Sequence, residues 1–259
     1  MRSFYKLLLI SSIIIITANC SEDPHVIYPN EHNLIQKALS HQERTDYEKS
    51  RDKQRKAEAI LAIAAIKPGM KVADLDAGSG YYSELFSYLI GDEGRVYLQN
   101  APRYTTNNGD KLTKRLENNR LSNVVRLDSE FNNLKLPNDL DLIFIGLAFH
   151  DVYVNQKNPE WNGDPKIYIK QLYDSLSEDG KLLIIDHNAP LGSDTKHTNK
   201  LHRIDELFVI SQLESVGFKL VLSSDILRNP EDDMSVFIWD ENVFRKTDRF
   251  VLLFSKGIN

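Results

Sequence analysis

Cysteine is almost absent from this chain of 259 residues, which carries a single one, Cys20. One cysteine cannot form a disulfide within the chain, and it cannot supply the thiolates of a structural zinc site. An excess of positive charge is also missing, because 37 acidic residues outnumber 32 basic ones and leave a formal net charge of -5. Nucleic-acid binding normally needs a basic surface, so no nucleic-acid partner is expected.

The apolar run near the start of the chain is too short to cross a bilayer. It covers 12 residues, 7–18, whereas a membrane-spanning helix needs about 20. The basic residues Arg2 and Lys6 precede the run, and a polar segment begins at Ser21. This order is typical of an export signal, although a buried N-terminal helix is the alternative.

The four residues "TANC" at 17–20 resemble the lipobox of bacterial lipoproteins. In that family the cysteine thiol is lipidated and the cysteine becomes the new N-terminus. Asn19 and Thr17 depart from the residues usual there, and a plain secreted protein with a free thiol is the alternative. The resemblance implies that Cys20 carries lipid and anchors an exported protein to a membrane, on the periplasmic or cell-surface side. Several acyl chains anchor a protein firmly, whereas one does so only marginally.

The chain divides into three segments by composition. Residues 1–19 are predicted to be the signal peptide, 20–48 a tether with a short helix at 31–40, and 49–259 a single domain. The basic stretch 49–56 is interpreted as the solvated face of a helix, with a binding patch as the alternative. The same helix is expected to continue along an apolar face and to end at Pro68.

Strands and helices alternate along most of the domain. Strands are predicted at 71–76, 94–100, 123–128, 140–149, 181–187, 219–227 and 248–256, and further helices at 81–90, 109–119, 165–176 and 202–217. This alternation predicts an α/β fold with a doubly wound, mostly parallel sheet. The strand at 140–149 is almost wholly apolar, as expected where helices cover both faces of a sheet.

The stretch "DLDAGSG" at 74–80 leaves the first of these strands and opens a helix. Gly78 and Gly80 lack Cβ atoms and permit close approach of the backbone to a ligand, and the helix N-terminus adds partial positive charge. A dinucleotide-binding loop needs a third glycine and an acid about 20 residues on. Ser83 and the amides of Gln99 and Asn100 stand at those places, so binding of a nicotinamide dinucleotide is disfavoured.

Three motifs resemble those of the class I S-adenosylmethionine-dependent methyltransferases, over residues 67–256. They are "KPGMKVADLDAGSGYYS", "LDLIFIGLAFHDV" and "LSEDGKLLIIDH". The tail, with "HRIDE", "NPEDD" and "KTDRFVLLFSK", resembles a narrower group of predicted methyltransferases that are often exported and have no assigned substrate. The resemblance implies a Rossmann-like methyltransferase fold and S-adenosylmethionine as cofactor.

Carried over by position, the resemblance assigns cofactor-binding residues to the first three strand ends. Asp74, Gly78 and Gly80 would line the methionine end of the cofactor, and Asp128 would lie near the adenine. Gln99 or Asn100 would face the ribose.

Two residues depart from the family pattern at this site. Asp76 stands where the first glycine is usual, and amides replace the acid that normally binds the ribose. Both departures predict weakened cofactor binding, which Asp76→Gly and Asn100→Asp are expected to restore. The alternative is that Asp76 meets the ammonium or sulfonium of the cofactor.

Polar residues also follow two later strands. His150 and Asp151 follow the fourth strand, and Asp186, His187 and Asn188 follow the fifth. Histidine titrates near neutral pH, so His150 is a candidate base, and Asp151 a candidate to orient it or to bind a cationic substrate. The alternative is that these residues only cap strand ends.

No metal site is predicted from the spacing of ligand-type residues. His197 and His202 are five positions apart and do not share a helical face, and no third ligand lies at a suitable spacing. Trp161, in a polar loop after the fourth strand, is interpreted as a loop anchor or as a lid.

Two functions remain open from the sequence. The first is a membrane-tethered methyltransferase acting on a small molecule or a lipid headgroup. The second is a non-catalytic binding or scaffold lipoprotein that keeps the fold. Export favours the second, because S-adenosylmethionine is made in the cytoplasm, whereas the polar strand ends favour the first.

Overall fold

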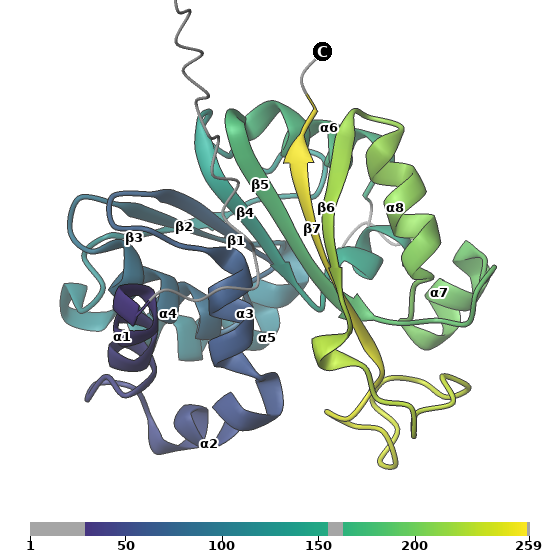
Figure 1. The fold of residues 1–259 in the computed structure, drawn as a ribbon, viewed down its shortest axis with the longest axis horizontal. Helices are drawn as coiled ribbons and strands as arrows, with labels where there is room; N and C mark the ends of the chain where they lie inside the picture. The colour runs from purple at the N-terminus through teal and green to yellow at the C-terminus, as the bar shows by residue number, and fades with distance from the viewer. Residues whose placement is uncertain (1–28, 155–162, 258–259) are drawn as a thin grey trace, which may run out of the picture.

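Seven strands form one sheet in the computed structural model, which describes residues 29–154 and 163–257 (Figure 1). The strand order is β3-β2-β1-β4-β5-β7-β6. The strands are β1 (Lys71–Leu75), β2 (Arg95–Asn100), β3 (Val124–Asp128), β4 (Leu140–Gly146), β5 (Leu176–His187), β6 (Phe218–Ser224) and β7 (Arg249–Lys256). Only β7 runs antiparallel to its neighbours. The predicted doubly wound, mostly parallel sheet is confirmed.

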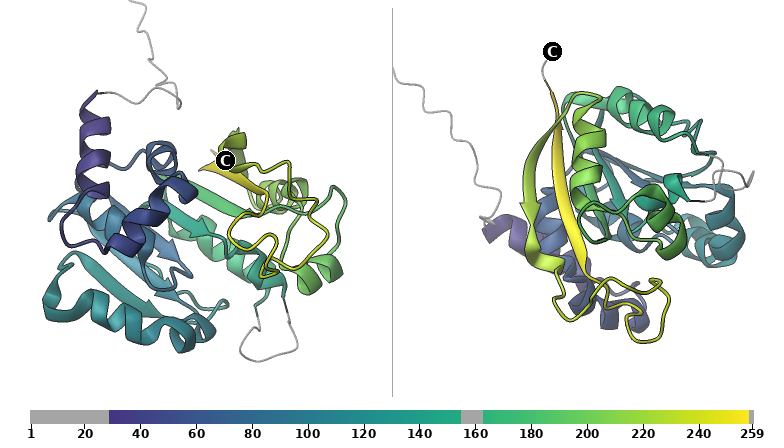
Figure 2. Two further views of the ribbon diagram at one scale, coloured as in Figure 1. Left: turned by 90° about the horizontal axis from the view of Figure 1, so that it is seen from below. Right: turned by 90° about the vertical axis from the view of Figure 1, so that its right-hand side faces the viewer.

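Helices cover both faces of this sheet (Figure 2). The α-helices are α1 (Pro29–Leu39), α2 (Asp46–Arg55), α3 (Ala57–Ala64), α4 (Tyr81–Ile90), α5 (Pro102–Leu116), α6 (Pro165–Ser175), α7 (Thr195–Leu201) and α8 (Glu206–Glu214). Short 3-10 helices are η1 (Glu117–Asn119), η2 (Phe149–Tyr153) and η4 (Asp225–Leu227).

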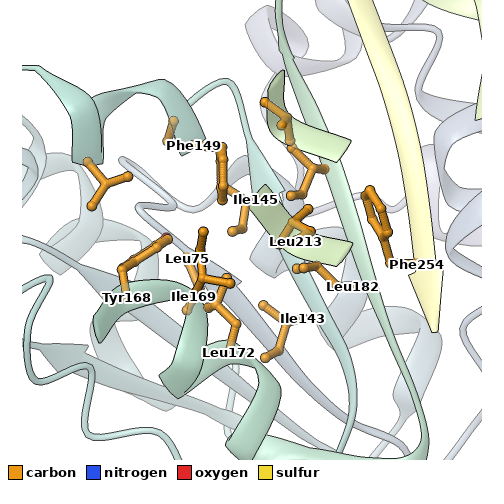
Figure 3. Packing of buried hydrophobic residues seen from close by; sticks show 14 of the residues in the cluster. Leu75, Ile143, Ile145, Phe149, Tyr168, Ile169, Leu172, Leu182, Leu213 and Phe254 are labelled. Atoms are coloured by element: carbon orange, nitrogen blue, oxygen red, sulfur yellow. The ribbon is translucent and has the colours of Figure 1, made fainter. Parts of the chain in front are cut away.

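The core has two parts because successive side chains of a strand point to opposite faces. In β4, Ile143 and Ile145 pack with α6 and α8, and Figure 3 shows Ile143 near Leu172 of α6 and Ile145 near Phe149. Leu142 and Phe144 of the same strand pack on the other face with α1, α3 and α4. This two-sided burial explains why β4 is apolar along its whole length.

Three helices differ from the expected ranges. The helix expected from residue 49 is two helices, because Lys56 adopts a left-handed conformation with φ of 46° between α2 and α3. The helix expected at 202–217 begins later, where Asp205 caps α8 by accepting a hydrogen bond from the Leu207 N–H. The helix expected at 109–119 begins earlier, at Pro102, because proline is favoured in the first turn of a helix.

Several predictions lie outside the described residues, namely the signal peptide, Cys20 and Trp161. Within residues 29–154 and 163–257, none of the helices combines the length and apolar character that crossing a bilayer requires.

Strand order reverses between β1 and β4. From β1 the chain moves outward to β2 and β3, and then returns to place β4 on the other side of β1. Ligands of doubly wound folds bind beyond the carboxyl ends of the strands at such a reversal. The loop after β1 and the segment after β4 both lie at this position.

Candidate active site

The loop between β1 and α4 adopts a conformation that favours glycine. Asp76, Gly78 and Gly80 have φ angles of 48°, 61° and 81°. A Cβ on Gly80 would lie 2.9 Å from Cδ1 of Leu98, so a side chain there would displace Leu98 as well as strain the backbone. Asp76 takes its positive φ without being glycine, which asparagine and aspartate tolerate better than most residues.

Asn100, at the end of β2, holds the glycine loop by two hydrogen bonds. Its Oδ1 accepts from the Gly78 N–H at 2.8 Å, and its Nδ2 donates to the Gly78 carbonyl at 3.0 Å. Gln99 beside it accepts from the Asp76 N–H at 3.2 Å and donates to the Ser129 carbonyl at 3.1 Å. Both amides are fully buried. These hydrogen bonds fix the loop. A contact of either amide with a ribose stays a prediction.

Two buried carboxyl groups lie beneath the loop. Asp74 accepts a hydrogen bond from the Ser83 hydroxyl at 2.5 Å, and burial raises its pKa to about 7. Burial likewise raises the pKa of Asp76 to about 6. One oxygen of Asp76 accepts from the Ala101 N–H at 3.2 Å, while Oδ2 is buried without a hydrogen-bond partner among the described residues.

Asp128, at the end of β3, borders an open groove of about 410 Å³. Its side chain is 47% exposed and accepts hydrogen bonds from Arg126 and Thr105. The groove is also lined by Pro102, Thr105 and Ser129. Among the predicted cofactor residues, Asp128 is therefore the one whose carboxylate is open to solvent.

Three arginines gather next to the start of α4, beside the glycine loop. Arg55 stacks 4.2 Å from the ring centroid of Tyr81. Arg51 lies one turn earlier on α2, and Arg249 lies on β7. Burial lowers the pKa of both guanidinium groups, and the nearby positive charge of Arg55 lowers both further. In the part of the chain that the structure describes, the Nε atoms of all three are buried without a hydrogen-bond partner. The stretch 49–56 thus contributes two half-buried cations as well as a solvated face.

His150 lies in η2, immediately after β4, and is 2% exposed. Its Nδ1 lies 2.8 Å from Oδ1 of Asp186 at the end of β5, and its backbone N–H donates to Oδ2 of the same carboxylate at 2.7 Å. The prediction that the ends of the fourth and fifth strands carry neighbouring polar groups is confirmed. When Nδ1 donates its hydrogen bond to the Asp186 carboxylate, the neutral tautomer has its lone pair on Nε2.

Asp151, the next residue, is held through one oxygen. The Arg103 guanidinium and the Tyr104 hydroxyl, both from α5, contact Oδ2. The other oxygen, Oδ1, lies 3.2 Å from Nε2 of His150 and 3.4 Å from Nδ1 of His202. The structure therefore adds His202 to the two residues selected from the sequence.

His202 reaches this cluster because the tail of the chain folds back over the sheet edge. It ends α7 in a left-handed conformation with φ of 55°. The next residue, Arg203, is fully buried and binds both carboxylate oxygens of Asp232, at 2.8 and 3.0 Å. Arg203 and Asp232 belong to the "HRIDE" and "NPEDD" motifs, so these two motifs are joined by a buried ion pair.

Two other polar residues at the end of β5 form hydrogen bonds with the segment just before β7. Nδ1 of His187 lies 2.7 Å from the Thr247 hydroxyl, and Asn188 donates to Asp248 at 2.9 Å. Burial lowers the pKa of His187 well below its usual value. For His187 and Asn188, the interpretation as strand-end caps agrees with these bonds.

The fold is that of the class I S-adenosylmethionine-dependent methyltransferases, and the comparisons support that resemblance. The chain is similar to a methyltransferase of this kind from Aquifex aeolicus, with a TM-score of 0.58, 20% identity and coverage of 87% of this chain and 98% of that one. It is also similar to the YcgJ protein of Bacillus subtilis, with a TM-score of 0.52, 14% identity and coverage of 76% and 95%.

A curated relative gives a similarity in sequence. The ubiquinone/menaquinone biosynthesis C-methyltransferase of Shewanella frigidimarina is 26% identical over 166 residues, which are 64% of this chain and 59% of the relative. The match thus spans less than two thirds of the relative's length. No family model matches the chain.

Proposed function

We propose that the protein is an S-adenosylmethionine-dependent methyltransferase whose acceptor is a small molecule or a lipid headgroup. The observation that carries the proposal is the glycine loop after β1, which lies at the reversal of strand order and is fixed by Asn100. A loop that is held by paired hydrogen bonds, with glycines at positive φ, presents its backbone to a ligand in a fixed shape. The similarity to C-methyltransferases supports the same activity.

The residues around the loop fit the charged end of this cofactor. The buried Oδ2 of Asp76 is an acceptor without a partner among the described residues, and it suits an ammonium or sulfonium group. Arg51, Arg55 and Arg249 each have an Nε atom without a hydrogen-bond partner among the described residues, and these donors suit a carboxylate. This pattern favours the alternative in which Asp76 contributes to binding.

The groove at Asp128 extends from the same edge and suits the adenosine end. When bound, the cofactor supplies an electrophilic methyl group. The protein's task is then mainly to hold the acceptor in line with that group at about 3–3.5 Å. In this proposal the acceptor binds beside His150 and Asp151, which follow the neighbouring strand β4.

Calorimetric titration of the purified protein with S-adenosylmethionine and S-adenosylhomocysteine tests the proposal. Both ligands are expected to bind at one site. Absence of binding for both at millimolar concentration would refute it. Binding without transfer of a labelled methyl group to any component of a membrane or metabolite extract would instead point to the non-catalytic binding protein.

We also propose, from the sequence alone, that the mature protein begins at lipidated Cys20 and is exported. The single cysteine after a short apolar run supports this. Mass spectrometry of the native protein should detect an acylated N-terminal Cys20, and Cys20→Ser should move the protein from the membrane to the soluble fraction. An unmodified thiol at residue 20 would contradict the proposal.

A further inference from the structure

We propose that His150, Asp151 and His202 form a binding site for a first-row divalent cation, best matched by Zn²⁺. The three residues come from two segments that meet at the carboxyl edge of the sheet, η2 after β4 and the end of α7. Two imidazoles and one carboxylate are ligands that Zn²⁺ and related ions prefer.

The spacing of the three ligand atoms fits one ion. The distances are 3.3 Å from Nε2 of His150 to Nδ1 of His202, 3.2 Å from that Nε2 to Oδ1 of Asp151, and 3.4 Å from Oδ1 to Nδ1 of His202. Ligand atoms about 2.1 Å from a tetrahedral ion lie about 3.4 Å apart, and those around an octahedral ion about 3.0 Å apart. The observed triangle lies between these values and closer to the tetrahedral one, so the spacing matches a single bound cation.

The cluster also has more lone pairs than protons. His150 donates its Nδ1 proton to Asp186, so its Nε2 atom is an acceptor. Asp151 Oδ1 is an acceptor as well, and among the described residues it is buried without a hydrogen-bond partner. Nδ1 of His202 carries at most one proton to share between them. Oδ1 of Asp151 and Nε2 of His150 are thus acceptors that converge in a buried place, and a cation would satisfy both, because an unpaired buried carboxylate oxygen is costly.

The surroundings hold each ligand in a coordinating orientation. Asp186 fixes the ring of His150 in the manner common for metal-bound histidines. Arg103 and Tyr104 occupy Oδ2 of Asp151 and leave Oδ1 for the ion. With three protein ligands, a tetrahedral ion keeps one position for water or another oxygen or nitrogen ligand.

Metal binding and base catalysis exclude each other at His150, since both use the lone pair of Nε2. The cation proposal therefore replaces the role of His150 as a proton acceptor. It does not depend on the cofactor, because none of its three ligands belongs to the glycine loop. A failure to bind S-adenosylmethionine would leave the metal site standing, and the reverse also holds.

Titration with Co²⁺ is the direct test, because its visible absorption bands report tetrahedral nitrogen and oxygen ligands. The full-length protein is stripped with a chelator and titrated with Co²⁺, and then Zn²⁺ is added. We expect one equivalent of Co²⁺ to bind with intense visible bands, and Zn²⁺ to displace it. His202→Ala should weaken binding at least 100-fold, because it removes one of the three ligands, and even the loss of a residue that only orients a ligand costs about 10- to 100-fold.

His197→Ala is the matched control, since His197 lies on the same helix, α7, outside the cluster. It should bind Co²⁺ as the unaltered protein does. Absence of bands with the unaltered protein at millimolar Co²⁺ would overturn the proposal, as would unchanged binding by a folded His202→Ala variant. If that variant does not fold, Asp151→Asn replaces it, and the thermal midpoint with and without Zn²⁺ gives a second readout. Only the unaltered protein and the control should be stabilised by Zn²⁺.

Discussion

Two polar regions share the carboxyl edge of the sheet, and they differ in how their hydrogen bonds are matched. In the glycine-loop region, Asn100 and Gln99 pair each donor and acceptor with the backbone. In the histidine cluster, three ligand-type atoms lie close together, and Oδ1 of Asp151 is buried without a hydrogen-bond partner among the described residues. In the first region the two amides preserve the shape of the loop and Oδ2 of Asp76 is the buried atom left for a ligand, whereas in the second region that atom is Oδ1 of Asp151, which a cation would satisfy. Buried polar groups that are matched stabilise a fold, and unmatched ones mark a place for a ligand.

The largest effect is expected from removing the support of the loop. Asn100→Ala leaves both Gly78 backbone groups without their partner, which costs on the order of 1–3 kcal/mol each. We expect binding of S-adenosylmethionine to weaken by about 100-fold or more, together with a loss of stability measured by urea unfolding. Asn107→Ala on the exposed side of α5 is the control and should change neither quantity.

The hydrogen bonds from Asn100 to Gly78 also reverse the effect that the sequence predicted for Asn100→Asp. Asn100→Asp was expected to tighten cofactor binding by supplying an acid for the ribose. In the structure, Nδ2 of Asn100 donates to the Gly78 carbonyl, and a carboxylate cannot do so. We therefore expect Asn100→Asp to weaken binding. If calorimetry shows tighter binding, the two hydrogen bonds to Gly78 do not control the loop.

An intermediate effect is expected at Asp76, as a change of stability with pH. Burial raises its pKa in the folded protein to about 6, above the usual value of 3.8. The folded state thus holds this proton more tightly, so the contribution of Asp76 to stability is full below about pH 4 and is lost as the pH rises through 6. Asp76→Asn keeps an acceptor for the Ala101 N–H and removes the titration.

The difference in unfolding free energy between Asp76→Asn and the unaltered protein should be more favourable to the variant at pH 8 than at pH 4. The change in this difference should be on the order of 1–3 kcal/mol. Urea unfolding at both pH values measures this difference. Asp128→Asn, whose side chain is about half exposed, serves as the control and should gain little. An equal gain at pH 4 and pH 8 would show that the charge of Asp76 is not the cause.

The smallest effect is expected from His150→Ala on cofactor binding. His150 belongs to the histidine cluster, and its hydrogen bonds go to Asp186 and His202 rather than to the glycine loop. Binding of S-adenosylmethionine should change by less than about threefold, within the error of independent sites. A loss as large as that of Asn100→Ala would mean that the two regions work as one unit, and the comparison between them would fail.

Local patterns determined the main elements of this protein. The apolar residues of β4 and the turn after β1 are visible in the sequence because strand periodicity and glycine act over a few neighbouring residues. For the same reason the helix Tyr81–Ile90 was predicted within its observed bounds. The break at Lys56 was not predicted, because a left-handed lysine has no local signal.

Only the tertiary structure decided which polar residues meet. His202 was compared with His197, its neighbour in the chain, but its partners are His150 and Asp151, about 50 positions away. It reaches them because the buried pair of Arg203 and Asp232 folds the tail across the sheet edge. Asn100, likewise, pairs with the backbone of Gly78, which is 22 positions away in the chain. Sequence spacing gives the direction of a side chain within one helix or strand, whereas contacts between elements depend on how the whole sheet and its helices pack.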